Sequence, residues 1–403
     1  MTIWLIIFRS LRQHALSTIV TALCIALGGG LLMSVWCVKE QSRTIFEGVN
    51  GGFDAVLGAR GSQLQLVLNA IFHLEASPGN VAWQDYLDIS TNPAVETAVP
   101  IAVGDNYLGY RLVGVTTNLF SDVQYSPGKH YELESGRFFD PNRREAVVGS
   151  FVAQKLHLKV GDEFHPYHGL NFDPNGEQHP DRYIVLGVLK PSNTPADRVI
   201  WIPLAGIQHM TGHDPKAATD VSAVLIKLKG DSPYVGFNLG LLYNKQGNRL
   251  TFAFPIAAVI ADLFNKISWF DQILTLVAYL VALIATASIL ASIYNSMNER
   301  RREIAILRAL GARRRTIFGA ILLEAATISA LGMVIGFAFY GVIMAVAANV
   351  IRAQTGVVLD PMKYCPVMLW APAMLIVLGA LAGVIPAVKA YRTQVAEYLV
   401  PSS

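Results

Sequence analysis

The sequence predicts a helical integral membrane protein with four transmembrane spans, arranged as one plus three around a large extracytoplasmic α+β domain. Three observations predict this fold class. Of the 403 residues, 53% are hydrophobic and only 15% are charged, whereas a soluble domain carries about 25% charged residues. Four apolar runs are each long enough to cross about 30 Å of hydrocarbon as a helix. A long segment of mixed charge separates the first run from the other three.

The N-terminal region predicts a surface helix followed by the first span. Residues 1–14 place Arg9, Arg12 and His14 among apolar residues, which is typical of an amphipathic helix on the membrane surface. Residues 15–38 contain no charged residue and predict a retained span. A cleaved signal peptide is the alternative, but its apolar core is only about 7–15 residues long, and this run is longer.

Residues 39–270 predict the extracytoplasmic domain. They have mixed charge, frequent Gly and Pro, and eight of the nine histidines. Segments rich in β-branched and aromatic residues predict strands at 96–103, 107–117, 146–150, 183–190, 199–202 and 221–227. Helices are predicted at 63–73, 151–158 and 255–266. The combination predicts an α+β fold.

Three further apolar runs and the loops between them define the predicted topology. Spans are expected at 271–298, 316–349 and 364–388, separated by segments 299–315 and 350–363 and followed by a tail at 389–403. Arginine and lysine gather in the N-terminal region, in 299–315 and after the last span. The positive-inside rule therefore predicts that both termini and segment 299–315 are cytoplasmic, with the domain and segment 350–363 on the other side.

Segment 299–315 is the strongest candidate for a binding site. It carries seven arginines, and Ile304, Leu307 and Leu310 recur at helical spacing. One face of the predicted helix is therefore apolar and the other basic, and Gly311 offers a stop before the next span. This pattern favours docking onto a soluble partner. The alternative is that the arginines only fix the topology.

Polar and small residues inside the spans predict contacts between helices. Apart from Asp271, the first residue of the second span, Glu324 is the only acidic residue within a predicted span, and we expect it to pair with an arginine or a neighbouring helix rather than to relay protons. Gly332 and Gly336 in the third span, and Gly379 and Gly383 in the fourth, have the spacing that lets helices approach closely. Packing within one chain and packing between two chains are both open.

The sequence predicts no metal site, no cofactor site and no catalytic site. His165, His168 and His179 could suggest a metal site, but they lie in a Gly/Pro/Asn-rich segment that we interpret as a polar surface loop, and His209 and His213 receive the same interpretation. Whether segment 165–179 binds metal stays open. The three cysteines form neither a disulfide framework nor a metal-binding spacing. The sequence contains no GxxxxGK[ST], HExxH or GxSxG pattern, so the chain is not expected to be an enzyme. The net charge of +3 is too mild to indicate nucleic-acid binding.

Several segments resemble one family of membrane proteins. The sequence ERRREIAILRALGA at 299–312, with Glu324 following it, resembles the signature of the FtsX-like permease domain found in MacB-like ABC transporter permeases of the macrolide-exporter and lipoprotein-release types. Residues 383–390 resemble the end of the last span in that family, which places the FtsX-like domain at about 273–395. Residues 53–62, 134–139 and 146–149 resemble the MacB-like periplasmic core domain of the same permeases. Thr-Gln-Val at 393–395 departs from the family, which often has a proline there.

The resemblance implies a permease subunit in the bacterial inner membrane that transmits ATP-driven motion to its periplasmic domain. The expected partners are a cytoplasmic ABC ATPase subunit, which holds ATP and magnesium, a second permease copy, membrane lipid and a periplasmic adaptor or substrate-binding protein. The residues expected to contact the ATPase are Glu303, Ile304, Leu307, Arg308 and Gly311.

The residue types suggest how this contact works and which functions remain open. Ile304 and Leu307 would fill an apolar groove, and Glu303 and Arg308 would orient the helix by charge pairing. The implied substrate is a hydrophobic or amphipathic compound, a peptide or a lipid-linked molecule. Two alternatives remain: an FtsX-like transmembrane regulator of a periplasmic enzyme, and a membrane-anchored receptor or scaffold without an ATPase.

Overall fold

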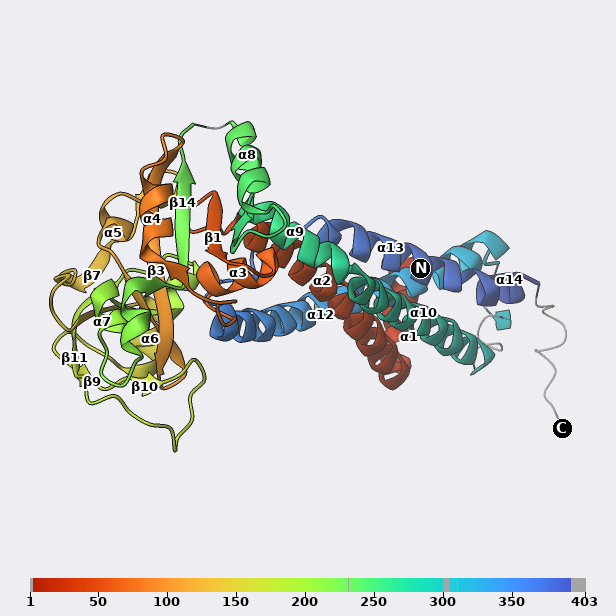
Figure 1. Ribbon diagram of the computed structural model, residues 1–403. Coiled ribbons are helices and arrows are strands. Elements are labelled where there is room, and N and C mark those ends of the chain that lie inside the picture. The colour runs from red at the N-terminus through yellow and green to blue at the C-terminus, as the bar shows by residue number, and fades with distance from the viewer. Residues whose placement is uncertain (1–2, 231, 300–304, 307, 310, 393–403) are drawn as a thin grey trace. The chain divides into compact units, whose positions relative to one another are not determined.

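The chain folds into two compact units that each have their own hydrophobic core. The computed structural model describes residues 3–230, 232–299, 305–306, 308–309 and 311–392. A helical unit consists of Met1–Ser42, Ile267–Ala348 and Leu359–Ser403. An α+β unit consists of Arg43–Lys266 and Asn349–Val358 (Figure 1).

Long apolar helices form the helical unit. Its helices are α1 (Ile3–Gln13), α2 (Ala15–Gly48), α10 (Ser268–Glu299), α12 (Arg314–Thr355), α13 (Val367–Ala382) and α14 (Val384–Arg392). Among the described residues, four helical stretches are long and apolar enough to cross a membrane: Ala15–Gly48, Ser268–Asn295, Arg314–Thr355 and Val367–Lys389. These four stretches confirm the predicted fold class, with four candidate transmembrane helices and the α+β domain between the first and the second.

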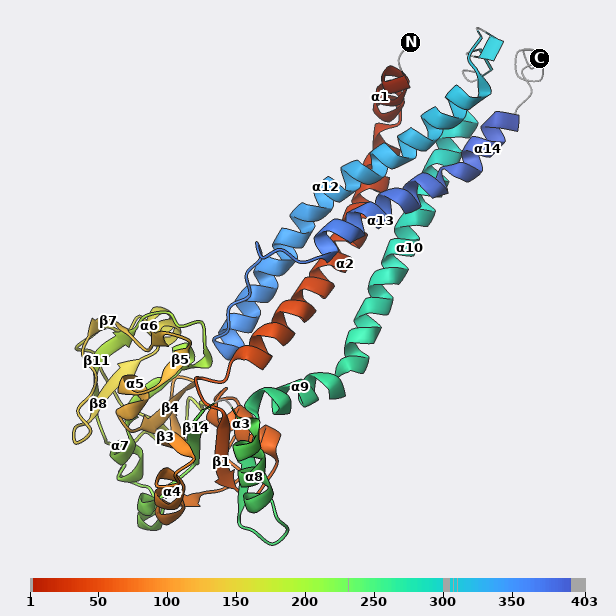
Figure 2. The same ribbon diagram turned by 90° about the horizontal axis from the view of Figure 1, so that it is seen from above.

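The helices of this unit pack through small and branched side chains. Figure 2 shows α2, α10, α12 and α13 running alongside one another. Their shared core includes Ile25, Met33 and Leu375, each of them buried. Beyond the apolar core, the buried Gln41 of α2 makes two hydrogen bonds with the backbone of Asp360, at 3.0 and 3.1 Å. This pair of bonds fixes the segment between α12 and α13 against α2.

A mixed sheet forms the centre of the α+β unit. The strands lie in the order β15-β1-β14-β3-β4-β12-β8-β11-β7, with β10 paired to β3 and β9 paired to β11. The pairs β4–β12 and β8–β11 are parallel. The strands are β1 (Ala55–Ala59), β3 (Val95–Tyr107), β4 (Tyr110–Val115), β7 (Leu133–Gly136), β8 (Glu145–Val148), β9 (Glu163–Phe164), β10 (Tyr167–His168), β11 (Tyr183–Leu189), β12 (Ile200–Pro203), β14 (Ala223–Leu228) and β15 (Leu250–Ala253). The pairs β2 (Val81–Ala82) with β13 (Asp220–Val221), and β5 (Gln124–Ser126) with β6 (Lys129–His130), lie outside this sheet.

The sheet is buried on both faces because helices cover each of them (Figure 1). Side chains alternate between the faces, so Val56 joins one core while its neighbours Ala55 and Leu57 join the other. The first core receives side chains from α3 (Gln63–Ala70), α5 (Asn118–Ser121) and α9 (Ile256–Lys266). The second receives side chains from α4 (Trp83–Ser90), α6 (Ser150–Leu156), α7 (Leu204–Gln208) and α8 (Pro233–Tyr243). Short 3-10 turns lie at Pro195–Arg198 and Pro215–Thr219.

The boundaries between the units differ from those expected from hydropathy. The α+β unit begins at Arg43, which lies within α2 beyond the apolar part of that helix. The unit also contains Asn349–Val358. This second segment packs on the α+β unit: a Cβ atom on Gly356 would lie 3.0 Å from the carbonyl oxygen of Thr194. The Arg352 guanidinium lies over the ring of Phe151, 5.4 Å from its centroid. The end of α12 therefore belongs to the α+β unit.

Candidate functional site

The arginine-rich segment predicted to bind a partner is only partly described. Glu303, Ile304 and Leu307 lie outside the described residues. The described residues 305–306 and 308–309, which include Arg308, are helical. Gly311 has φ +98°, in the left-handed region that favours glycine, and its amide donates to the carbonyl oxygen of Arg308 at 3.1 Å. A glycine in this conformation ends a helical turn, and α12 begins soon afterwards at Arg314.

Glu324 of α12 contacts the N-terminal helix. The buried hydroxyl of Ser10 in α1 donates a hydrogen bond to Glu324 Oε1, and Glu324 itself is half-buried. A carboxylate within a span needs such a polar partner, because hydrocarbon offers none. The contact with a neighbouring helix agrees with the structural role expected for this residue, and that role stays a prediction.

The glycines of the third span lie at the contact between α12 and α2. A Cβ atom on Gly332 would lie 2.7 Å from the Cβ of Ile25. A Cβ atom on Gly336 would lie 3.2 Å from the carbonyl oxygen of Ala26. Gly30 of α2 faces Gly336 in turn, since a Cβ on Gly30 would lie 2.9 Å from the Gly336 carbonyl oxygen. These small residues therefore bring two backbones of the same chain close together.

The glycines of the fourth span lie at the contact between α13 and α12. A Cβ atom on Gly379 would collide with the side chain of Ser329. A Cβ atom on Gly383, the residue that follows α13, would lie 2.9 Å from the Cβ of Ala325. Both glycine pairs thus pack against other helices of the same chain. This is one of the two arrangements that the sequence left open, the other being packing between two chains.

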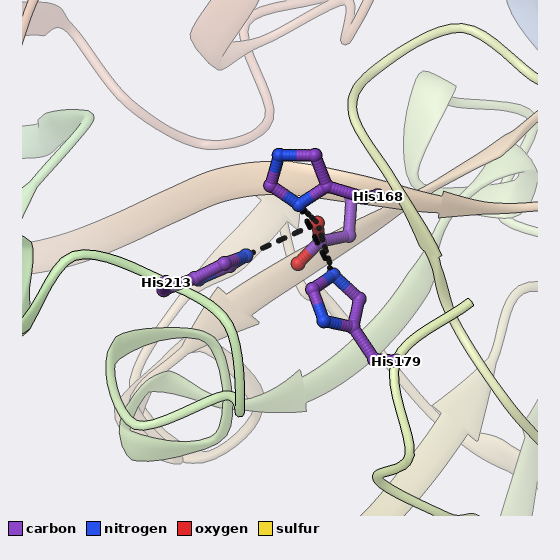
Figure 3. A group of neighbouring side chains, drawn as sticks. His168, His179 and His213 are labelled. Carbon is purple, nitrogen blue, oxygen red and sulfur yellow. Dashed lines mark hydrogen bonds and ion pairs between the residues drawn. The ribbon is translucent and has the colours of Figure 1, made fainter. Parts of the chain in front are cut away.

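A cluster of one aspartate and three histidines lies in the α+β unit. Asp105 Oδ1 is 3.1 Å from His179 Nε2, 3.3 Å from His213 Nε2 and 3.7 Å from His168 Nδ1. His168 Nδ1 is also 3.3 Å from His179 Nε2. Figure 3 shows the three rings turned toward a common point from separate segments of the chain. We call these four residues the Asp105 cluster.

The local backbone of β3 positions the carboxylate. The register between β3 and β4 shifts between Val103 and Asn106, and such a bulge redirects side chains. Asp105 and Asn106 lie in this irregular stretch, and both are fully buried. Across the ladder, His168 of β10 lies directly opposite Asp105, and the amide nitrogen of the Asn106 side chain donates to the carbonyl oxygen of Gly169 at 2.8 Å.

Backbone carbonyl groups orient the other two rings of the cluster. His179 Nδ1 lies 2.7 Å from the carbonyl oxygen of Thr211, and His213 Nδ1 lies 3.0 Å from that of Ile207. The amide of Thr211 in turn donates to Asp181 Oδ2 at 2.8 Å. Gly212, with φ +98°, makes the turn between Thr211 and His213. Both Nδ1 atoms therefore donate to carbonyl groups, and both Nε2 atoms point at Asp105.

Burial and charge distinguish the members of the Asp105 cluster. Asp105 is 0% exposed and His179 is 5% exposed, whereas His168 is 57% exposed. The hydrogen bond to Asp105 raises the pKa of His213, and burial opposes that rise. Among the described residues, Asp105 Oδ2 has no hydrogen-bond partner.

The sequence analysis did not predict the Asp105 cluster. The interpretation of 165–179 as a polar surface loop is wrong for His179, which is buried. His165 and His209 stay outside the cluster, with Nδ1 contacts to the carbonyl oxygens of His179 at 3.3 Å and Ala205 at 3.1 Å. Asp105 lies far from the histidines in sequence, and no short motif marks it.

Comparison with protein families and curated proteins identifies relatives over most of the chain. The model for the MacB-like periplasmic core domain matches residues 18–233, and the model for the FtsX-like permease C-terminal region matches 275–395. The macrolide export ATP-binding/permease protein MacB of Brucella abortus is 24% identical over 401 residues, covering 95% of this chain and 58% of that protein. The MacB protein of Brucella melitensis is 25% identical over 403 residues with the same coverage. The chain thus spans 58% of the length of these curated relatives.

Solved structures of extracytoplasmic domains have a lower sequence identity to this chain than the curated proteins have. The periplasmic region of MacB from Actinobacillus actinomycetemcomitans is 11% identical, with a TM-score of 0.36 over 54% of this chain and 94% of that one. The extracellular domain of the ABC-type transporter YknZ from Gram-positive bacteria is 18% identical, with a TM-score of 0.31 over 49% of this chain and 99% of that one.

Two family models together extend from the first span to the last, in the order in which the α+β unit and the final helices occur. The first of them alone matches more than half of the chain. The chain therefore belongs to the family of ABC transporter permeases that join a MacB-like periplasmic core domain to an FtsX-like permease region.

Proposed function

We propose that this chain is the permease subunit of an ABC transporter whose ATPase is a separate cytoplasmic subunit. In this proposal the helix at 299–312 docks on the ATPase. ATP-driven motion of the ATPase then moves the α+β unit on the far side of the membrane. Segment 299–315 and both termini are cytoplasmic, and the α+β unit is periplasmic in a bacterial inner membrane.

The observation that carries this proposal is the continuity of α12. This helix runs unbroken from Arg314, near the end of the arginine-rich segment 299–315, to Thr355. Its last turns belong to the α+β unit, where Arg352 stacks on Phe151. A single helix is stiff along its axis, so a displacement at its first turn carries to its last. The proposal assigns α12 this role of transmitting force.

We place the ATPase outside the 403 residues. The curated relatives are named as ATP-binding/permease proteins. The 403 residues contain no GxxxxGK[ST] pattern, the loop with which such ATPases bind nucleotide phosphates. We therefore propose that ATP and magnesium are held by the partner chain.

The proposed cargo is a hydrophobic or amphipathic compound, a peptide or a lipid-linked molecule taken from the membrane or the periplasm. The curated relatives are named for macrolide export, and a macrolide is one member of this class. A second copy of the permease would complete the transporter, with a periplasmic adaptor or substrate-binding protein as a further partner.

Co-purification tests the docking step. Leu307→Glu places a charge on the apolar face of the docking helix. We expect the ABC ATPase subunit to co-purify with the wild-type chain from native membranes in mild detergent, and at least about tenfold less of it to accompany the variant, since buried apolar anchors dominate such interfaces.

Ala309→Glu is the matched control, because Ala309 is exposed and helical spacing predicts that it lies on the face opposite to that of Leu307. This variant adds the same charge and should keep the ATPase. Equal recovery of the ATPase with wild type and Leu307→Glu would remove the docking role of this helix.

A further inference from the structure

We propose that the Asp105 cluster binds a divalent transition-metal ion, and that zinc is the ion its ligands fit best. The four ligand atoms are Asp105 Oδ1, His168 Nδ1, His179 Nε2 and His213 Nε2. They lie within 4.8 Å of one another. The site is independent of the docking helix and of the proposed transport activity.

The spacing of the ligand atoms matches a tetrahedral site. Zinc–ligand bonds of about 2.0–2.1 Å at tetrahedral angles hold neighbouring ligand atoms about 3.3 Å apart. From Asp105 Oδ1 to the three nitrogens the distances are 3.1, 3.3 and 3.7 Å, and His168 Nδ1 is 3.3 Å from His179 Nε2. These four of the six distances lie within about 0.4 Å of the tetrahedral value, and the two from His213 Nε2 to the other rings are at most 4.8 Å, so an ion at the centre would draw the His213 ring and the other two rings together.

The surrounding hydrogen bonds hold two of the rings in the form that binds a metal. His179 Nδ1 and His213 Nδ1 face the carbonyl oxygens of Thr211 and Ile207, at 2.7 and 3.0 Å. A neutral ring that donates its Nδ1 proton presents a lone pair at Nε2. Metal-binding histidines are commonly oriented by such a bond to a carbonyl group.

A cluster without a cation leaves its centre poorly satisfied. Three ring nitrogens converge on one oxygen of Asp105, which is completely buried. Its second oxygen, Oδ2, finds no hydrogen-bond partner within the part of the chain that the structure describes. A ring that already donates from Nδ1 can donate to Asp105 from Nε2 only as a charged imidazolium, whereas a cation at the centre lets neutral rings face the carboxylate with their Nε2 lone pairs.

The ligand types select the class of ion. Three imidazoles and one carboxylate at tetrahedral spacing are typical of zinc. Calcium and magnesium take oxygen ligands, six or more for calcium and an octahedral set for magnesium, so they fit poorly. The exposed His168 leaves the site open to ions from solvent. Bound zinc would tie the segments around His168, His179 and His213 to β3.

Zinc binding by the full-length protein tests this proposal. The detergent-purified chain is stripped with a chelator, dialysed against zinc sulfate buffered at a fixed free concentration, and assayed for bound metal. We expect about one zinc per chain for a four-ligand site. His168→Gln should weaken zinc binding at least about tenfold, because removing even an outer partner of a ligand costs that much.

The choice of variants keeps the result interpretable. His168 is exposed, so His168→Gln should leave the fold intact, which the elution volume on gel filtration checks. His165→Gln removes an exposed histidine from the same segment and should retain the wild-type zinc affinity. A wild-type chain that retains no zinc would overturn the proposal, as would equal affinities of wild type and His168→Gln.

Discussion

Single small residues decide how closely the spans of this protein approach one another. Gly332 lies where a Cβ atom would come 2.7 Å from the Cβ of Ile25 and 2.9 Å from the carbonyl oxygen of Ala22. Neither neighbour is the free end of a flexible side chain, so α2 and α12 would have to separate. For Gly341, in the same helix, no heavy atom of the described residues outside its own stretch of helix lies within 4 Å of the position of a Cβ.

These two glycines predict opposite effects of the same substitution. Gly332→Ala should destabilise the helical unit by about 1–3 kcal/mol, the usual cost of overpacking. Gly341→Ala should leave stability unchanged or raise it by up to about 1 kcal/mol, because alanine favours the helix. Thermal unfolding of the detergent-solubilised protein measures both. A Gly332→Ala variant as stable as Gly341→Ala would show that α2 and α12 do not pack closely at this position.

Glu324 shows how far residue-level reasoning reached. Its position within a span predicted a polar partner, and Ser10 supplies one. The identity of this partner was not predictable, because Ser10 lies in α1 and is separated from Glu324 by more than 300 positions. The cost of an unpaired carboxylate in hydrocarbon predicts that a partner exists, but only the packing of helices identifies it.

At the scale of elements, α12 has more than one task. It spans the apolar region, packs against α2 through Gly332 and Gly336, and ends in the α+β unit. Hydropathy predicted the apolar part of α12 but not that its last turns join the soluble core. The same holds for α2, which continues as a helix to Gly48 through charged residues. The length of an apolar run predicts which part of a helix lies in the membrane. The helix itself continues as far as its backbone hydrogen bonds do.

A break in α12 should uncouple its two ends. Ala348→Pro removes a backbone donor and clashes with the preceding turn, which costs about 3 kcal/mol and kinks the helix. We expect the ATPase to co-purify as with wild type, since the docking helix is untouched. The ATP-dependent change in protease sensitivity of the α+β unit should be lost.

Ala348→Leu is the control for this break, because leucine continues a helix. It should preserve the response to ATP. A protease pattern that still changes with ATP in Ala348→Pro would exclude α12 as the element that transmits the motion.

The Asp105 cluster shows what element-level prediction could not reach. The strands around 96–103 and 183–190 were predicted, and they appear as β3 and β11. The register shift beside Asp105 and Asn106 depends on the pairing of β3 with β4, which no local pattern encodes. His168 meets Asp105 only because β10 pairs with β3. Ligands drawn from separate segments form a site that short-range spacing does not reveal.

For the whole molecule, the division into two units explains why the overall fold was predictable. Membrane spans and a soluble domain obey different rules of composition, so charge and hydropathy separate them in the sequence. Glu303, Ile304 and Leu307 of the predicted docking helix lie outside the described residues. The role of this helix depends on the sequence pattern and on the family to which the chain belongs.

The central claim is that the docking helix and the α+β unit face opposite sides of the membrane. Two single-cysteine variants test it in a background in which Cys24, Cys37 and Cys365 are replaced by serine. Ala309→Cys reports on the docking segment, and Lys229→Cys reports on the α+β unit; both positions are exposed.

The measurement is labelling of spheroplasts with a maleimide that cannot cross the membrane. We expect Lys229→Cys to be labelled in intact spheroplasts and Ala309→Cys to be labelled only after the membrane is permeabilised. Labelling of both cysteines in intact spheroplasts, or of neither before permeabilisation, would contradict the account.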